Sequence, residues 1–277
     1  MSYPSPAGQL GRHVRNQVRL FARTPIAVFF VILLPLIMLV LFNALFGDST
    51  VDTGSGEWKM SQFYVGGLAA FTAVSATFTS LANTVPIRRD EGVLKRWRGT
   101  PERPWVVLGG MIGSSIVLAA GGAVIMLALG VIAYDLEIEA AKVPAIIVTF
   151  LVGVAAFAAM GMAVAGICPN ASAASALANV IILPMAFISD VFIALEDPPA
   201  WLDTLGDILP LKPFAQAFQD CFNPEVAAPA FDWGRLALVA AWGVVGLVVA
   251  LKFFRWEPSK GGTTRGRRAR VAAVSDG

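Results

Sequence analysis

Six long apolar stretches divide the charged residues of this chain by sign. When successive loops are assigned to alternate sides of a membrane, 17 of the 21 Lys and Arg fall on one side and 14 of the 19 Asp and Glu on the other. An excess of Lys and Arg in the loops of one side orients helical membrane proteins with that side in the cytoplasm. The sequence therefore predicts an integral membrane protein with both termini in the cytoplasm.

Composition supports a chain that is surrounded by lipid. Of the 277 residues, 56% are hydrophobic and only 14% are charged, which is too apolar for a water-soluble domain of this size. A crossing needs about 20 helical residues, and the apolar runs lack the alternation of strands. We expect an all-α fold with crossings at about 25–46, 62–86, 106–134, 143–168, 174–195 and 234–254. The first run is too long for a signal peptide and is treated as a retained helix.

Segments outside the crossings also have a pattern. Residues 8–23 predict an amphipathic helix, with Leu10, Val14, Val18 and Phe21 on one face and Arg12, Arg15, Arg19 and Arg23 on the other. We expect it to lie flat on the inner leaflet and to touch a cytoplasmic partner; the alternative is a simple topology signal. Between residues 196 and 233, prolines, acids and apolar residues predict short helices at or dipping into the outer interface. The transmembrane domain is expected to cover 1–258, followed by a basic, disordered tail at 259–277.

Polar and aromatic residues within the crossings are candidates for a translocation path, because lipid-facing positions rarely carry them. The second crossing has such a stripe at a spacing of three or four residues, and two residues of the fifth crossing could face it: Phe71, Thr72, Ser75, Thr79 and Asn83, with Asn179 and Phe187. Alternatively, the hydroxyls bond the preceding turn or join helices. The crossings carry no chain of ionisable groups for proton transfer, which argues against an ion-coupled antiporter.

Few residues suggest catalysis, a metal or a disulfide. The single His is His13, and Cys168 and Cys221 are expected at opposite faces of the membrane, so they cannot pair within one chain. A bridge between two chains through Cys221 stays open beside the free thiol. Asp190 lies in an otherwise apolar run; it is either a hydrated residue at the outer end of the fifth helix or a gate that attracts cations.

The basic loop at 87–105 gives the most specific functional signal. It contains Glu91 and Gly92, the helix-compatible run Val93 to Arg98 with Leu94, Arg96 and Trp97, and then Thr100 and Pro101. An acid, a Gly, an apolar residue, basic residues and a Thr-Pro pair in this order resemble the loop after the second crossing of ABC-2 type permeases, the membrane subunits of ATP-driven exporters. A positively charged topology loop would explain the arginines but not the Glu-Gly and Thr-Pro pairs.

The resemblance implies that this loop forms a coupling helix seated in a groove of an ATPase. A helix with an apolar side at Val93, Leu94 and Trp97 and a charged side at Lys95 and Arg96 could be docked there by packing and by ion pairs. Pro101 would end such a helix.

A second part of the resemblance covers the fifth crossing and the segment after it. The run Asn179 to Leu183, then Phe187, Ser189, Phe192, Pro198 to Leu202 and the Pro210-Leu211 pair follow the family's order, although Asp190 stands where the family usually has Gly. The resemblance implies an outer gate that includes Ser189, Asp190 and Pro210. The substituted Gly puts a detailed transfer of that gate in doubt.

Together these features predict the permease half of a bacterial ABC exporter in the plasma membrane. The resemblance implies two permease subunits, identical or closely related, with membrane lipids around them and no nucleic acid. The chain has no G-x-x-x-x-G-K-[ST] loop, so it is not expected to be an enzyme or to bind a cofactor; ATP and Mg²⁺ would belong to a separate phosphate-loop ATPase. A drug, a polyketide-like metabolite or a lipid is the expected substrate. The alternatives are a membrane partner of an ATPase that transports nothing and an ATP-independent carrier.

Overall fold

Long helices dominate the structure. The computed structural model describes residues 5–52, 56–98, 104–192, 199–254 and 256. Within these residues, six helical segments are long and apolar enough to cross a membrane: Phe29–Phe46, Met60–Asp90, Trp105–Ala133, Ala140–Ile167, Ala171–Ile188 and Trp233–Phe253. Each overlaps one of the six predicted crossings, which supports the all-α membrane class.

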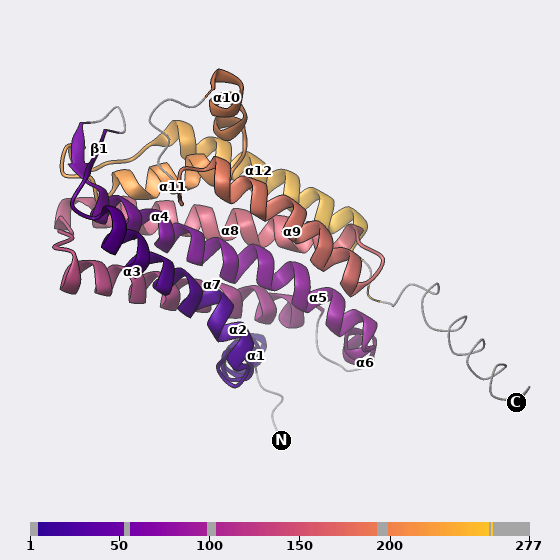
Figure 1. Cartoon of the computed structure of the whole chain (residues 1–277). Coiled ribbons are helices and arrows are strands. Elements are labelled where there is room, and N and C mark those ends of the chain that lie inside the picture. Colours follow the sequence, from indigo (N-terminus) through magenta and orange to yellow (C-terminus); the bar gives the residue numbers. More distant parts are fainter. Residues whose placement is uncertain (1–4, 53–55, 99–103, 193–198, 255, 257–277) are drawn as a thin grey trace, which may run out of the picture.

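Three of the spans are made of more than one helical element. The first follows the short helix α2 (Pro25–Val28) and comprises the π-helical turn η1 (Phe29–Leu33) and α3 (Leu34–Phe46). The second comprises α4 (Met60–Val74), the π-helical turn η2 (Ser75–Thr79) and α5 (Ser80–Asp90). The others are α7 (Pro104–Ala133), the short 3₁₀ turn η3 (Ala140–Lys142) with α8 (Val143–Ile167), α9 (Ala171–Ile188) and α12 (Trp233–Phe253). Figure 1 shows these helices side by side in one bundle.

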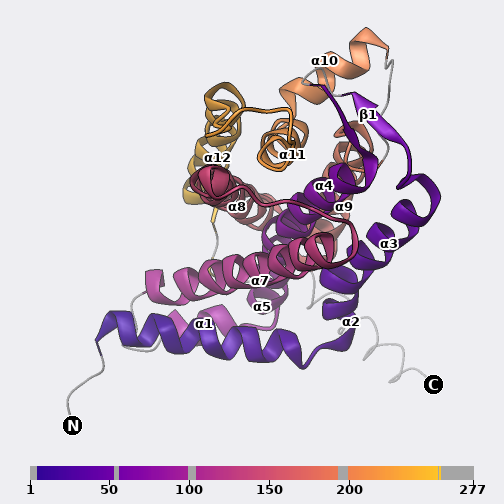
Figure 2. The ribbon, with the colours of Figure 1, turned by 90° about the vertical axis from the view of Figure 1, so that its left-hand side faces the viewer.

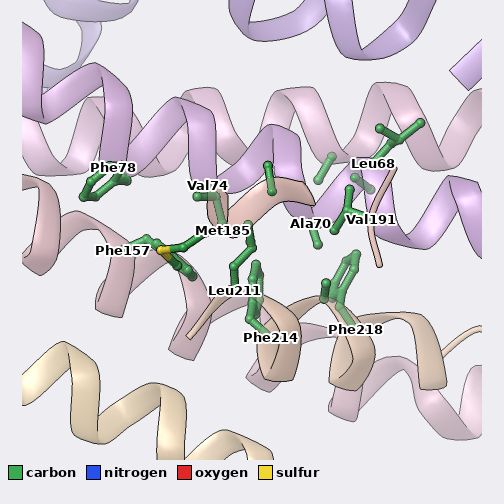
Figure 3. Packing of buried hydrophobic residues seen from close by; sticks show 14 of the residues in the cluster. Leu68, Ala70, Val74, Phe78, Phe157, Met185, Val191, Leu211, Phe214 and Phe218 are labelled. Carbon is green, nitrogen blue, oxygen red and sulfur yellow. The ribbon is translucent and has the colours of Figure 1, made fainter. Parts of the chain in front are cut away.

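The second span forms the centre of the bundle. In its apolar window 78% of the residues are buried, against 22% to 39% in the other five spans. Figure 3 shows Leu68, Val74 and Phe78 of this span facing side chains from the rest of the bundle, among them Phe157 and Phe214. A helix surrounded in this way has only a narrow exposed face. The residues on that face are therefore candidates for contact with a substrate or a second subunit.

Two helices outside the spans lie near one end of the bundle. The helix α1 (Pro6–Ala22) begins at Ser5, whose side chain accepts a hydrogen bond from the Gly8 amide, and it has Pro6 in its first turn. In Figure 1 it is seen almost end-on beside the bundle, and in Figure 2 it runs along α7. The second is α6 (Val93–Arg98). A helix therefore forms at the predicted amphipathic segment, and its position on the membrane surface stays a prediction.

The opposite end carries features that hydropathy did not indicate. The loop after the first span, which the sequence shows only as a short acidic connection, contains an antiparallel hairpin of β1 (Thr50–Asp52) and β2 (Glu57–Lys59), with Val51 paired to Trp58. We call the end with this hairpin the predicted outer end, and the end that carries α1 and α6 the predicted cytoplasmic end.

The fifth span ends earlier than expected. The sequence predicts a crossing to residue 195, whereas α9 ends at Ile188 and Asp190 has a φ of +57°. A left-handed residue cannot continue a right-handed helix, and Asp tolerates this conformation better than most residues. The residues that follow, 193–198, lie outside the described part of the chain.

Two short helices follow, as predicted for the segment between the last two spans. The first, α10 (Ala200–Ile208), is largely exposed, whereas α11 (Leu211–Asp220) is buried along most of its length. Phe214 of α11 fills the space left by Gly153 of α8, where a Cβ atom would collide with the Phe214 ring. Gln219 of α11 donates a hydrogen bond to the Phe63 carbonyl of α4 at 3.2 Å. The helix α11 is therefore part of the packed bundle.

Candidate functional site

A tight turn places α6 at the predicted cytoplasmic end. The second span continues to Asp90, Glu91 caps it, and Gly92 has a φ of +70° before α6 starts. A Cβ atom on Gly92 would meet nothing within 4 Å, so the backbone conformation, and not lack of space, requires glycine here. The predicted coupling residues Thr100 and Pro101 lie outside the described residues.

The apolar side of α6 faces its own protomer. Leu94 is fully buried in a cluster with Leu81, Val85 and Met111, and Trp97 packs against this cluster. Glu91, Lys95 and Arg96 are exposed. The structure thus leaves a charged surface for a partner, whereas the sequence had suggested that the apolar side would dock as well.

The helix α1 packs beside α6 and α5. His13 meets Trp97 with ring centroids 5.9 Å apart, and Arg88 of α5 donates a hydrogen bond to the Gln17 side chain. Gly110 of α7 allows close approach, because a Cβ atom there would lie 2.6 Å from the Cβ atom of His13. The arginine row of α1 is exposed: Arg12, Arg15, Arg19 and Arg23. Together, α1 and α6 present a mostly basic surface at this end.

Two consecutive charges at the end of α5 tie it to the connection between α8 and α9. Arg89 is 2% exposed, and its guanidinium donates to the carbonyls of Ala165 at 3.0 Å and Cys168 at 2.7 Å. Asp90 accepts from the amide of Ala171, the first residue of α9, at 2.7 Å. Arg89 thus satisfies carbonyls at the end of one helix while Asp90 satisfies an amide at the start of the next. The sequence placed both residues in the basic loop at 87–105 and did not predict these hydrogen bonds.

The exposed face of the second span is polar. From Phe71 to Thr84, its partly exposed residues are Phe71, Ser75, Thr79, Ser80, Asn83 and Thr84, whereas the apolar aliphatic residues of this stretch are buried. Phe71, Ser75, Thr79 and Asn83 follow one another at intervals of four residues and share one face of the span, and we call these four residues the polar stripe. Ser80 and Thr84 lie on the adjacent face, which borders α1 and α7. The π-helical turn η2 contains Ser75 and Thr79, and Asn83 donates to the Thr79 carbonyl at 2.7 Å. Lipid-facing positions normally show the opposite pattern.

The other predicted path residues divide into two groups. Thr72 is fully buried, its methyl group occupies the space at Gly122 of α7, and its hydroxyl donates to the Leu68 carbonyl, so it lies apart from the polar stripe. Asn179 and Phe187 are exposed on α9. The rings of Phe71 and Phe187 both contact Phe192, with centroid separations of 4.9 and 5.9 Å. Phe192 therefore links the second span to the end of the fifth.

A charge cluster lies where the outer gate was predicted. Lys212 of α11 is 5% exposed, and its Nζ atom lies 2.5 Å from Asp203, 3.1 Å from Asp207 and 3.7 Å from Asp190. Gly206 leaves the room that the Lys212 side chain occupies, since a Cβ atom there would lie 2.8 Å from it. One buried cation thus joins α11 to α10 and to the residue that ends α9.

Burial and charge act in opposite directions within this cluster. Burial raises the pKa of Asp190 above its usual value, and the nearby Lys212 only partly offsets this. Burial alone would lower the pKa of Lys212, but hydrogen bonds to Asp203 and Asp207 and the charge of Asp190 raise it overall. The other two residues of the predicted gate are buried: Ser189 donates to the Ala186 carbonyl at 3.0 Å, and Pro210 precedes α11.

Both cysteines are free and buried. Cys221 is 2% exposed, its thiol donates to the Ala217 carbonyl at 3.2 Å, and burial raises its pKa to about 11. A bridge between two chains would need this thiol to be exposed, so the structure favours the free thiol. Among the residues that the structure describes, no group of three or more His, Cys, Asp or Glu could hold a metal ion.

Six spans, of which the central one carries a polar stripe, and a short charged helix at one end are the features of a helical membrane permease. The model of the ABC-2 type transporter family matches residues 8–223, from α1 to just after α11. The chain therefore belongs to the ABC-2 type transporter family, as its 87–105 loop had suggested.

One relative is similar to this chain over most of its length. The chain is 25% identical over 245 residues to a daunorubicin resistance ABC transporter permease protein of Streptomyces coeruleorubidus. This similarity covers 86% of the chain and 82% of the relative, so it includes nearly all of both proteins.

Proposed function

We propose that this chain is the permease subunit of an ABC exporter and forms the path for an amphipathic or hydrophobic substrate. An ATPase on a separate chain, which binds ATP and Mg²⁺, drives transport through the loop at 87–105. The polar stripe of the second span is the observation that carries this proposal. The name of the relative adds daunorubicin as the first substrate to test.

The stripe argues for a path because of where it lies. Exposed positions on other spans carry large apolar side chains, such as Val180 and Leu183 of α9 and Leu251 of α12. Hydrocarbon would leave the hydroxyl and amide groups of the stripe without partners beyond their own helix, which costs free energy. A second permease subunit facing this stripe would enclose a channel lined by polar and aromatic groups, suited to an amphipathic molecule.

Paired isosteric substitutions test the path. Thr79→Val removes a hydroxyl from the stripe, and Thr77→Val removes one that is fully buried and donates to the Ala73 carbonyl at 2.8 Å. In vesicles that contain the permease and its ATPase, Thr79→Val and Asn83→Leu should change daunorubicin transport several-fold. Thr77→Val should leave transport near that of the wild-type protein, although it can lower thermal stability. Equal effects of Thr77→Val and Thr79→Val on transport would contradict the path, and ATPase activity without transport of any amphipathic drug tested would favour a non-transporting partner.

The contacts of α6 suggest how the ATPase could move the bundle. Arg96 on its charged side and Glu91 in the turn before it are exposed and available for ion pairs with the ATPase, while Leu94 is packed into the protomer. A displacement of α6 would therefore be passed to α5. Arg89 and Asp90 would pass it on to the connection between α8 and α9, because their hydrogen bonds join these segments directly.

Binding and transmission can be separated by two substitutions. Arg96→Glu, like Glu91→Ala, should reduce the ATPase recovered with the tagged permease, by about tenfold if one charged contact worth roughly 1.4 kcal/mol is lost. Lys59→Glu makes the same charge change on β2 at the other end and should have no effect. Arg89→Lys keeps the charge but loses the fork that reaches two carbonyls, so the ATPase should still bind while transport per ATP hydrolysed falls. Full transport in both Arg96→Glu and Arg89→Lys would contradict a coupling role for the 87–105 loop. The loop would then serve only as a topology signal.

A further inference from the structure

A cavity of about 340 Å³ lies between α1, α5 and α7 near the predicted cytoplasmic end. Its polar lining comes from all three helices and from Thr24 after α1: Gln17 of α1, Ser80, Thr84 and Arg88 of α5, and Ser114 and Ser115 of α7. None of the described residues that line it is acidic. Its volume falls in the range of about 300–1,000 Å³ in which small-ligand sites occur. The cavity is therefore large enough for a ligand, and its lining carries a net positive charge.

Arg88 supplies that charge and is incompletely bonded. Its Nη2 atom donates to Gln17, and the guanidinium carbon lies 5.9 Å from the centre of the Trp97 ring. Its Nη1 atom is buried and has no hydrogen-bond partner among the described residues. A buried donor on a charged group is costly to leave unpaired, so an acceptor in this cavity would stabilise the arrangement. An anionic oxygen is the acceptor that a guanidinium binds most strongly.

The remaining polar groups suit a larger headgroup. Ser80, Thr84 and Arg88 are four residues apart and share one face of α5, so their side chains line the cavity in a row. The hydroxyls of Ser114 and Ser115 already donate to the carbonyls of Met111 and Ile112, both at 2.8 Å. Their oxygens are left as acceptors for hydroxyl or ammonium groups of a ligand.

Apolar residues on the same cavity indicate an amphiphile and not a free ion. Leu20 and Ile87 line the cavity and are 56% and 45% exposed, and Ile26 and Phe30, next along the chain, are 72% and 58% exposed. An acyl chain could leave the polar cavity along this apolar surface into the bilayer. We propose that the cavity binds the phosphate-bearing headgroup of an anionic phospholipid, with Arg88 on the phosphate and α1 as the cover.

Bound lipid can be measured on the full chain with phosphatidylglycerol as the probe. Native mass spectrometry should find one phosphatidylglycerol retained per chain after mild delipidation, in preference to phosphatidylcholine. Arg88→Gln should lower this retention about tenfold or more, since it removes the cation. Arg12→Gln makes the same charge change on the exposed side of α1, away from the cavity, and should keep the lipid.

A second variant separates loss of binding from loss of folding. Thr84→Phe fills the cavity while Arg88 remains, so it should also release the lipid, and both variants must elute as the wild-type protein does on size exclusion. Undiminished retention in Arg88→Gln or Thr84→Phe would overturn the proposal, as would equal retention of phosphatidylcholine. Displacement of the lipid by millimolar inorganic phosphate would likewise overturn it and assign the cavity to a soluble anion. The test needs no transport, so its failure is distinguishable from failure of the exporter assignment.

Discussion

Lys212 forms ion pairs with Asp190, Asp203 and Asp207, which are up to 17 residues apart in the sequence. Its Nζ atom is the one cation of this cluster, and Asp190 beside it is largely buried. Since Asp203 and Asp207 are about half exposed, water screens part of their mutual repulsion, whereas Asp190 depends more on the lysine. The cluster is therefore asymmetric: removing the lysine and removing Asp190 should have opposite effects.

Lys212→Met should destabilise the protein by about 1–3 kcal/mol, because it leaves a partly buried carboxylate without its partner. Asp190→Asn should be neutral or stabilising at pH 7, since asparagine also tolerates the left-handed conformation and carries no charge to bury. The measurement is thermal unfolding of the purified permease in detergent. The opposite order, with Asp190→Asn the more damaging variant, would contradict this account of the cluster.

The same pair predicts a pH dependence. Because the pKa of Asp190 is raised in the folded protein, its contribution to stability is fully present below its usual pKa and is lost as pH rises through the raised value. The advantage of Asp190→Asn over the wild-type protein should therefore be greatest near neutral pH and should shrink on acidification. A difference that grows as pH falls would be inconsistent with a raised pKa.

Among the elements, α6 depends on a single backbone conformation. Gly92 has a positive φ with open space around it, so a substitution is judged by conformation alone. Gly92→Ala should cost about 1–2 kcal/mol locally, Gly92→Asn less although it is larger, and Gly92→Val the most. Recovery of the ATPase with the permease and thermal stability should both follow this order.

Gly121 is the matched control for this turn. It lies inside α7 and is exposed, and a Cβ atom there would also meet nothing within 4 Å, yet its backbone is helical. Gly121→Ala should thus be neutral or stabilising. If alanine were tolerated equally at both positions, the left-handed turn would not be what positions α6.

The elements also show which parts of the structure the sequence can predict. The six spans follow from apolar runs of sufficient length, and α1 follows from its two faces. The hairpin does not, because strands of three residues are too short to show alternation. The early end of α9 depends on the conformation of one residue, Asp190, within a run that is otherwise apolar.

Residue contacts across the chain were less predictable than the elements. The apolar side of α6 was visible in the sequence, but amphipathicity shows only that a face is buried and does not say against what. The pairing of Arg89 with Ala165 and Cys168 joins residues more than 70 positions apart, which no local pattern reports. Of the five residues that the sequence grouped on the second span, Phe71, Ser75, Thr79 and Asn83 share a partly exposed face, whereas Thr72 is buried against Gly122 of another helix.

At the scale of the whole molecule, the two ends of the bundle differ in charge. The end with α1 and α6 presents exposed basic residues, including Arg15 and Lys95, and the end with the hairpin carries most of the acids among the residues that the structure describes. Since Lys and Arg loops remain in the cytoplasm, the first end should face inward. This orientation would place α6 where a cytoplasmic ATPase can reach it and the Lys212 cluster at the external face.

Single introduced cysteines can test that orientation in cells. The native thiols give a low background, because Cys168 and Cys221 are 6% and 2% exposed and the raised pKa of Cys221 keeps it protonated near neutral pH. A membrane-impermeant maleimide should label Lys59→Cys on β2 in intact cells and should label Lys95→Cys on α6 only after permeabilisation. Labelling of Lys95→Cys from outside would reverse the orientation, and α6 could then no longer couple the permease to an ATPase in the cytoplasm.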